Sequence, residues 1–404
     1  MNCRFCNEKL NDIFVDLINS PASNSYLTQV QLDEPEIFYP LKTYVCQECK
    51  LVQIDEYKKS DDIFDKDYAY FSSYSIGWLR HAKIYVEMIT QKLSLDNTSI
   101  VTEIASNDGY LLQYFLQKDI PCLGIEPTES TARVAKEKGI KVIEDFFGTS
   151  LAKTLQKSDL ILGNNVLAHV PDINDFVYGL KLALKEKGTI TMEFPHLLNI
   201  IKENQFDTIY HEHFSYLSFY TVQKIFEAQG LKLYDVEQLS THGGSLRIYA
   251  THLENDTCII TKNIENLLEE EKAFGLFDMK IYQNFQEKAD KVKYDLIEFL
   301  IQQKRECKKV IAYGAAAKGN TLLNYAGIKN DLIKFVVDKS PHKQGKFLPA
   351  SHIPIVDEVK IMALKPDYIL ILPWNIKEEI IEQLAYVKEW DCKFVVAVPC
   401  LEIC

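Results

Sequence analysis

The sequence contains no run of about 20 apolar residues, which is the length that a helix needs to cross a bilayer. Its N-terminal segment, MNCRFCNEKLND, also lacks the apolar core of a signal peptide, so we expect a cytoplasmic protein with reduced thiols and no membrane partner. There is no excess of positive charge, since 45 lysines and arginines face 57 aspartates and glutamates. We therefore expect no nucleic-acid partner, because binding to phosphate backbones needs a basic surface.

The composition is otherwise that of an ordinary globular protein. Apolar residues make up 47% of the 404 residues and charged residues 25%, which is enough to build several cores without disulfide bonds. A chain of this length predicts two to three domains. The ten cysteines are unevenly spread, because four of them form two Cys-x-x-Cys pairs and the others are single.

The two Cys-x-x-Cys pairs predict a structural zinc site near the N-terminus. Each such turn presents two thiolates to one cation, and two turns complete a tetrahedron with no position left for water. The loop between the pairs is longer than in the usual zinc ribbon, and free thiols or a redox pair are the alternative. The four expected ligands are Cys3, Cys6, Cys46 and Cys49.

Alternating strand and helix patterns indicate an α/β fold with parallel sheets. One alternating block starts near residue 98 and a second near residue 308, and a charged stretch typical of a long helix separates them. An aromatic, helix-forming stretch precedes the first block. The predicted domains are a zinc-binding lobe at 1–65, a Rossmann-like domain at 66–255 with a leading helical segment at 66–95, a helical connector at 256–305, and a second Rossmann-like domain at 306–404.

The first block carries a turn that suits a cationic cofactor. In VTEIASNDGYLL a strand ends near Glu103 and a turn ends at Gly109, with two acidic side chains and a single glycine. A pyrophosphate site would need a G-x-G-x-x-G turn, whereas this turn suits S-adenosylmethionine. An ordinary strand end is the alternative. The expected cofactor residues follow four successive strands: Glu103, Ala105, Asn107, Asp108, Gly109, Glu126, Pro127, Asp145, Phe146, Asn164 and Asn165.

The second block begins with YGAAAKGNTLL, a small-residue turn that opens a helix. Such a turn lets a diphosphate approach the backbone amides at a helix N-terminus. Taken alone, the same turn suits a nicotinamide cofactor equally well. The residues expected to bind the nucleotide part of a substrate are Gly314, Lys318, Asn320, Thr321, Asp338 and Lys343.

Several long motifs resemble those of the nucleotide-sugar C-methyltransferases of deoxysugar biosynthesis, which methylate carbon 3 of a 4-keto sugar. The similar segments are YPLKTYVCQECKLVQ, ASNDGYLL, GIEPT, TIYHEHFSYLS, THGGSLRIY, YGAAAKGNTLLNY and DKSPHKQGKFLPASHIPI. The resemblance covers essentially the whole chain. It implies a zinc-bearing lobe, a central S-adenosylmethionine-binding domain and a C-terminal Rossmann-like domain that helps hold the nucleotide.

The segment Tyr210-His211-Glu212-His213 is the expected catalytic centre. Methylation of a carbon beside a ketone needs a base that removes the α-proton, and histidine suits this task. The resemblance implies that His213 is the base and that the sugar lies near Tyr210, Glu212, His169 and Tyr70. Metal binding by the two histidines is the alternative. We expect His211 to be structural, and His196 is a weaker candidate for the site.

Together these features predict an S-adenosylmethionine-dependent C-methyltransferase that acts on a nucleoside-diphosphate 4-keto-deoxysugar by enolisation at carbon 3. Thymidine diphosphate is the expected nucleotide, and a monomer is the expected state. The alternatives are O- or N-methylation of a nucleotide sugar, a nicotinamide-dependent nucleotide-sugar oxidoreductase, and a zinc-containing protein that only binds such sugars.

Overall fold

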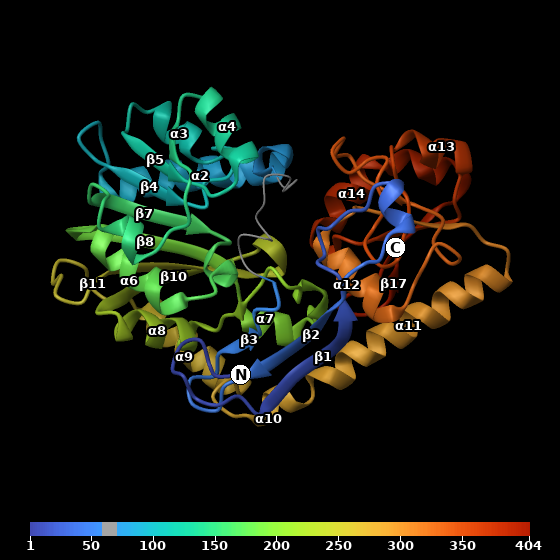
Figure 1. Ribbon diagram of the computed structural model, residues 1–404, viewed down its shortest axis with the longest axis horizontal. Coiled ribbons are helices and arrows are strands. Elements are labelled where there is room, and N and C mark those ends of the chain that lie inside the picture. Colours follow the sequence, from blue (N-terminus) through green and yellow to red (C-terminus); the bar gives the residue numbers. More distant parts are fainter. Residues whose placement is uncertain (59–70) are drawn as a thin grey trace.

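The computed structural model describes residues 1–58 and 71–404 of the chain. Three sheets organise this part of the protein, and Figure 1 shows two α/β units above a small N-terminal lobe. The α/β class and the two Rossmann-like units agree with the sequence prediction. Tyr70, which the resemblance places near the sugar, lies outside the described residues.

The N-terminal lobe is a four-stranded antiparallel sheet in the order β1-β2-β3-β9. Its strands are β1 (Asp12–Ser20), β2 (Tyr39–Val45), β3 (Val52–Ile54) and β9 (Ser215–Tyr216). A short 3-10 helix, η1 (Val30–Asp33), lies between β1 and β2. The fourth strand comes from far along the chain, so the lobe is completed by a segment that lies beyond its own sequence range.

The first α/β unit is a seven-stranded sheet in the order β10-β11-β8-β7-β4-β5-β6. The strands from β8 to β6 are parallel, while β11 pairs antiparallel with both β8 and β10. Their bounds are β4 (Val101–Ile104), β5 (Cys122–Ile125), β6 (Lys141–Ile143), β7 (Ser158–Asn164), β8 (Leu184–Pro195), β10 (Leu231–Leu239) and β11 (Ser245–His252).

Helices cover both faces of this sheet, as its apolar pattern requires. Leu160 and Leu162 of β7 pack on one side with α2, α3 and α4, whereas Ile161 between them packs on the other with α6 and α8. Parallel strands buried on both faces are continuously apolar for this reason. The helices are α2 (Ile76–Leu93), α3 (Leu112–Leu116), α4 (Glu129–Glu137), α5 (Thr149–Ala152), α6 (Ile173–Ala183), α7 (Leu197–Lys202) and α8 (Phe219–Ala228).

The charged stretch between the two units forms three helices, where the sequence pattern suggests one long helix. They are α9 (Lys262–Phe274), α10 (Lys280–Gln283) and α11 (Phe285–Arg305). The break follows α9, where Gly275 adopts the left-handed conformation (φ +101°) that ends a helix without steric cost. As a result α9 packs on the first unit, whereas α11 packs on β1 and the second unit.

The second α/β unit has the strand order β14-β13-β12-β15-β16-β17, and all pairs except the last are parallel. The strands are β12 (Val310–Tyr313), β13 (Val336–Val337), β14 (Ile355–Val356), β15 (Tyr368–Ile371), β16 (Lys393–Val396) and β17 (Glu402–Ile403). The helices are α12 (Ala317–Ala326), α13 (Val359–Leu364) and α14 (Lys377–Gln383).

One apolar core joins the N-terminal lobe to the second α/β unit. Strand β1 contributes Phe14 and Leu17, and the segment after α7 contributes Phe206 and Phe214 to the same cluster as α11 and α12. Phe14 stacks on Phe285 of α11 with ring centroids 4.4 Å apart. The lobe and the second unit therefore share their core, and residues 197–216 run through it. Within the described residues, no helix has the length and apolar character needed to cross a membrane.

A buried carboxylate fastens α9 to the first unit. Glu271 of α9 is fully buried and accepts hydrogen bonds from His196 Nε2 (2.7 Å) and from the backbone amides of Phe219 and Tyr220 (2.5 and 2.8 Å). These amides start α8, where a helix leaves its N–H groups without internal partners. The weaker catalytic candidate His196 thus lies in a structural contact.

We expect the Glu271→Ala variant to lower the free energy of unfolding by about 3–5 kcal/mol, because three donors lose their acceptor inside the protein. Denaturant unfolding measures this change. The control is Glu269→Ala, which removes an exposed carboxylate of the same helix and should change stability by less than about 0.5 kcal/mol. Equal stability of the two variants would contradict the fastening role.

Candidate functional site

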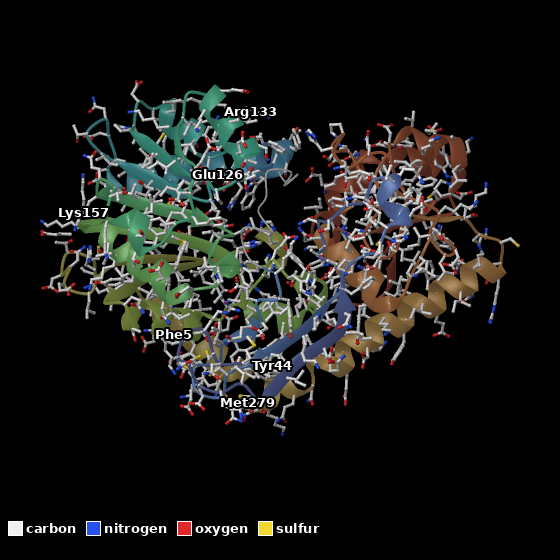
Figure 2. The ribbon with its side chains drawn as sticks, viewed as in Figure 1. Phe5, Tyr44, Glu126, Arg133, Lys157 and Met279 are labelled. Atoms are coloured by element: carbon white, nitrogen blue, oxygen red, sulfur yellow. The ribbon has the colours of Figure 1, made fainter. Side chains whose placement is uncertain are left out.

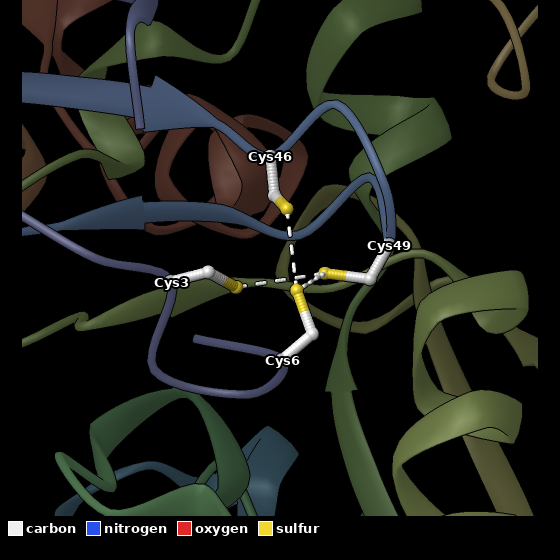
Figure 3. Close-up of side chains that lie close together, drawn as sticks. All are labelled: Cys3, Cys6, Cys46 and Cys49. Carbon is white, nitrogen blue, oxygen red and sulfur yellow. Dashed lines mark hydrogen bonds between the residues drawn. The ribbon is translucent and has the colours of Figure 1, made fainter. Parts of the chain in front are cut away.

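The four cysteines predicted as metal ligands converge on one point. Figure 3 shows their sulfur atoms facing one another, and all four lie within 4.8 Å of each other. The Sγ–Sγ distances are 3.5 Å for Cys3–Cys49, 3.5 Å for Cys6–Cys46 and 3.7 Å for Cys6–Cys49. A tetrahedral zinc ion with Zn–S bonds of about 2.3 Å places its sulfurs roughly 3.8 Å apart, so the cluster fits this metal.

Polar contacts hold one of the cysteines in place. Gln53 Nε2 donates to Cys3 Sγ (3.2 Å), and the backbone amide of Arg4 donates to Gln53 Oε1 (2.9 Å). A donor aimed at a ligand sulfur stabilises the thiolate and orients it. With four sulfur ligands and no open position, the site is structural.

The two cysteine turns are hydrogen-bonded to the first α/β unit. A metal that fixes these turns therefore also fixes the lobe on that unit. The Arg4 guanidinium donates to the carbonyl of Pro171 (2.7 Å), and the Asn174 amide donates to the carbonyl of Phe5 (2.9 Å). Thr221 Oγ1 of α8 donates to the carbonyl of Cys49 (3.0 Å). Figure 2 shows Phe5 at this lower end of the molecule, with Tyr44 and Met279.

The predicted cofactor turn leaves β4 in an unusual backbone conformation. Ala105 and Asn107 have φ angles of 56° and 49°, and Gly109 has 74°. A side chain at Gly109 would also approach Ile140 Cδ1 to 2.3 Å, so only glycine fits at this position. Left-handed residues that cluster in one turn are costly and are typical of ligand-binding loops.

Three carboxylates gather at this turn. Glu103 is fully buried in β4, and burial raises the pKa of its carboxyl well above the usual range, with smaller contributions from Asp108 and Glu126. Glu126, marked in Figure 2 on the first unit, accepts from the backbone amides of Asn107 (2.8 Å) and Thr128 (3.0 Å). The only salt bridge of these carboxylates within the described residues joins Asp108 to Lys138 at 3.6 Å. A cationic ligand at this turn would favour the ionised carboxylates, because a nearby opposite charge lowers the pKa of a carboxyl group.

The remaining predicted cofactor residues follow β5, β6 and β7. Asn164 Nδ2 donates to Tyr110 Oη (3.3 Å), and Asn165 Nδ2 donates to His242 Nε2 (2.7 Å). Pro127 is half-buried beside Glu126. Asp145 and Phe146 are exposed after β6, where the side chain of Phe146 is 41% accessible. The structure thus places all of these residues at the carboxyl ends of neighbouring strands.

Residues 72–74 contact the predicted cofactor turn, and the sequence contained no signal for this. The backbone amide of Ser72 donates to Asn107 Oδ1 (2.9 Å), and that of Ser73 donates to Asp108 Oδ2 (3.3 Å). The hydroxyl of Tyr74 lies 3.1 Å from His342 Nε2 of the second unit. This short segment therefore connects the turn to the other α/β unit.

The histidine predicted as the base has a defined tautomer. His213 Nδ1 lies 2.9 Å from the carbonyl oxygen of Thr208, and because a carbonyl only accepts, Nδ1 carries the proton. Burial lowers the pKa of His213 well below its usual value, so the ring is neutral and Nε2 has a free lone pair. Its ring centroid lies 4.0 Å from that of Tyr210 and 4.6 Å from that of His169.

His169 reaches this cluster from the loop after β7. Burial lowers its pKa to about 4, against a hydrogen bond with the Glu212 backbone that raises it. The structure therefore brings together Tyr210, His213 and His169, as the motif comparison expected. By contrast, His211 is directed to the N-terminal lobe, where its Nε2 donates to the carbonyl of Pro40 (3.2 Å). This contact agrees with the structural role that the sequence analysis expects for His211.

Glu212 is buried and faces the N-terminal lobe. Both of its oxygens accept from Asn24 Nδ2, each at 2.8 Å. Burial raises the pKa of this carboxyl to about 7, although the Asn24 amide favours the ionised form. Sequence reasoning did not find Asn24, because a lone asparagine in a loop nearly 190 positions away shows no pattern.

A second buried network holds His242 against the cofactor loop. Glu193 accepts from Arg247 Nη2 (2.9 Å), His81 Nε2 (2.9 Å) and Thr241 Oγ1 (2.8 Å). Thr241 precedes His242, so this network positions the imidazole that Asn165 contacts. The motif THGGSLR contains the histidine, but neither spacing nor composition singled it out.

The predicted nucleotide-binding residues divide into two groups. Asp338 Oδ2 accepts from the Ala315 amide (2.8 Å), and Lys343 Nζ donates to the Ala315 carbonyl (2.8 Å). Gly314 precedes them with φ +87°, close to Pro373. The second group, two residues of α12, makes contacts with the N-terminal lobe and with the segment before Tyr210.

These joining contacts come from Asn320 and Thr321. The Asn320 amide donates to the carbonyl of Ser23 (2.5 Å) in the N-terminal lobe, and Thr321 Oγ1 donates to the carbonyl of Ile209 (3.0 Å). Lys318, on the first turn of the same helix, donates to Asn375 Oδ1 (2.8 Å). The helix that was expected to meet a diphosphate thus also lies against the YHEH segment.

We expect the Cys46→Ser variant to lose its zinc and to melt at a clearly lower temperature, because the lobe's metal site contributes folding energy. Metal analysis by atomic emission and thermal unfolding measure the two effects. Cys400→Ser, at an exposed cysteine outside the cluster, should keep both the zinc and the melting temperature of the unmodified protein. Full zinc content in Cys46→Ser would contradict the assignment.

Three family models match the chain in succession. Residues 3–64 match a zinc binding domain, residues 78–236 a methyltransferase domain, and residues 240–399 a C-methyltransferase C-terminal domain. Among solved structures, the chain resembles magnesium protoporphyrin IX methyltransferase of Synechocystis PCC 6803 with bound SAH (TM-score 0.36, 15% identity, 44% of this chain and 84% of that chain). It also resembles the PH0226 protein of Pyrococcus horikoshii OT3 (TM-score 0.38, 12% identity, 46% and 95%).

A similarity over the full length comes from the C-methyltransferase NovU of Streptomyces niveus. The two proteins are 31% identical over 404 residues, which cover 98% of this chain and 95% of NovU. The matched methyltransferase domain identifies S-adenosylmethionine as the cofactor, and the cysteine cluster with the matched zinc domain identifies zinc as the structural metal. The chain therefore belongs to the zinc-containing, S-adenosylmethionine-dependent C-methyltransferases.

Proposed function

We propose that this C-methyltransferase acts on a thymidine-diphosphate 4-keto-deoxysugar and methylates carbon 3 of the sugar. The observation that carries the proposal is the state of His213, a neutral imidazole whose Nε2 carries the lone pair and whose ring packs against Tyr210 and His169. A base of this kind is what a carbon acid beside a ketone needs. A methyl transfer to oxygen or nitrogen would need no carbanion.

In the proposed reaction, His213 Nε2 takes the proton from carbon 3. The electrons of the broken C–H bond form a double bond to carbon 4, and the carbonyl π electrons move to the oxygen to give an enolate. Carbon 3 then attacks the methyl group of S-adenosylmethionine, the sulfur keeps the electrons of the broken C–S bond, and the carbonyl forms again. The products are the methylated keto-sugar, S-adenosylhomocysteine and a proton on His213.

The other residues of the junction orient the sugar. Tyr210 packs against His213 at a tilt and presents its hydroxyl to the substrate, and the ring of His169 makes an edge contact with the same imidazole. Ionised Glu212, held by Asn24, accepts a hydrogen bond from a substituent of the sugar ring. Tyr70 completes this set in the proposal through the motif resemblance.

The cofactor lies at the acidic turn after β4 in this proposal. Burial raises the pKa of Glu103, and the positive charge of a bound sulfonium or ammonium group would stabilise the ionised forms of Glu103 and Asp108. Glu126 binds the ribose hydroxyls. Asn164 and Asn165 contact the bound molecule from the end of β7. The exposed Asp145 and Phe146 line the adenine.

The nucleotide lies on the second α/β unit in this proposal. The loop that begins at Gly314 offers backbone amides to the diphosphate, and Lys343 adds positive charge beside Asp338. The segment containing Ser72 and Tyr74 contacts both α/β units, so a single chain supplies contacts for both ligands. This arrangement supports a monomer as the working unit.

We expect the His213→Ala variant to lose about 10²–10⁴-fold in the exchange of the carbon-3 proton for deuterium, and equally in methyl transfer, because the base is missing. Mass spectrometry of a nucleotide 4-keto-sugar in D₂O with S-adenosylhomocysteine present measures the exchange. His252→Ala is the control, since this histidine lies at the far end of β11. Unchanged exchange in His213→Ala would refute its role as base.

We also expect the rate of exchange to fall as the pH is lowered through about 7. Burial raises the pKa of Glu212 to about 7, so its ionised, accepting form is lost below that pH. In Glu212→Gln the rate is lower overall, but its inflection near pH 7 disappears. The remaining loss of rate then occurs below pH 6.5, because burial lowers the pKa of His213. An inflection near pH 7 that persists in Glu212→Gln would contradict this assignment.

A further inference from the structure

Lys318 has a half-buried side chain, and its ammonium group has few partners within the described residues. Its Nζ donates one hydrogen bond, to Asn375 Oδ1 (2.8 Å), and lies 4.5 Å from the centre of the Trp374 ring. No carboxylate of the described residues lies within 4.0 Å of it, and burial lowers its pKa. A cation that is partly removed from water, with two N–H donors beyond this bond, is stabilised when an anion or a strong acceptor binds there.

The surroundings of Trp374 show where this ammonium lies. Trp374 Nε1 donates to Asp207 Oδ2 (2.7 Å), next to the Thr208 carbonyl that holds His213. On the other side the ring touches Gly243, where a Cβ would approach Trp374 Cη2 to 2.5 Å. Gly243 follows His242. Lys318 therefore lies over a ring that is in contact with both histidine-bearing loops.

The pKa shifts of the two histidines agree with a position of Lys318 near both loops. After burial, the charge of Lys318 lowers the pKa of His242, and it also contributes to the lowered pKa of His213. The carboxylate that opposes this charge is Asp207, whose own pKa burial raises to about 6. The positive potential of Lys318 is thus exerted at the imidazole of the base.

Lys318 and Lys343 lie on opposite sides of the loop after β12. In the sheet, β12 has β13 on one side and β15 on the other. Lys343 follows β13 and contacts Asp338, whereas Lys318 contacts Asn375 after β15. The two lysines therefore have different surroundings, because Lys318 lies over Trp374, whose indole bonds to Asp207, whereas Lys343 lies over the Tyr26 ring.

We propose that Lys318 is a catalytic residue that hydrogen-bonds the ketone oxygen of the sugar and stabilises the enolate formed when His213 removes the α-proton. This inference rests on the proposed function. When the C–H bond breaks, its electrons form the C=C bond and the carbonyl π electrons move to the oxygen, where the ammonium meets the new negative charge. The charge leaves the oxygen again when the carbon attacks the methyl group, and Lys318 keeps its proton throughout.

The test compares Lys318→Met and Lys343→Met in the full-length zinc-bound protein. One measurement is the rate of deuterium exchange into a saturating thymidine-diphosphate 4-keto-6-deoxyhexose with S-adenosylhomocysteine present. The other is the dissociation constant of thymidine diphosphate alone, by titration calorimetry. Lys318→Met should lose about 10²–10³-fold in the saturated exchange rate, which is the usual effect of removing a donor to an oxyanion, and keep its affinity for thymidine diphosphate within about twofold.

Lys343→Met should weaken the binding of thymidine diphosphate, so that its exchange rate falls chiefly at low substrate concentration. Lys329→Met, at an exposed lysine just beyond α12, is the control for the loss of a charge and should match the unmodified protein in both. Melting temperatures show that each variant is folded, and replacing a half-buried lysine by methionine is not expected to unfold the protein.

A loss of tenfold or more in the affinity of Lys318→Met for thymidine diphosphate would overturn the proposal in favour of a phosphate-binding lysine. An unchanged exchange rate would overturn it as well. If the unmodified protein exchanges no proton of any 4-keto-sugar while it still binds S-adenosylmethionine, the proposed function fails, and that outcome is visible before any variant is compared.

Discussion

The arrangement of the site depends on the burial of residues 197–216 in a core that belongs to two other parts of the protein. Phe206 and Phe214 are packed with side chains of β1, α11 and α12, and Ile209 accepts a hydrogen bond from α12. Between these anchors lies the YHEH segment. Because apolar burial fixes both of its ends, the hydrogen bond from His213 to the Thr208 carbonyl can set the orientation and tautomer of the imidazole.

The same burial determines the charges around the reaction. Desolvation lowers the pKa of His169 and His213, so both imidazoles are neutral, and it raises the pKa of Glu212. A low-dielectric surrounding also strengthens the field of the single ammonium of Lys318. In the proposed reaction the neutral imidazole of His213 is shielded from water, and the ammonium of Lys318 is the positive charge that stabilises the enolate.

The zinc site affects the candidate active site through the N-terminal lobe that it stabilises. The cysteine turns contact the first α/β unit through the side chain of Arg4 and through the carbonyl of Cys49. Strand β1 of the same lobe packs against α11. The lobe therefore links the cofactor-binding unit to the unit proposed for the nucleotide. Asn24, in a loop of this lobe, contacts Glu212 directly, so the lobe also contributes a side chain to the junction.

The amino-acid sequence by itself determined the α/β class, the zinc ligands and the family, because local patterns record these features: strand periodicity, Cys-x-x-Cys turns and long motifs. It did not show the break at Gly275, since the apolar spacing continues across it. Nor did it indicate Asn24 or the surroundings of Lys318, whose partners lie far away in the chain. Only the tertiary structure decided these, because hydrogen bonds and desolvation depend on which distant segments the shared core brings together.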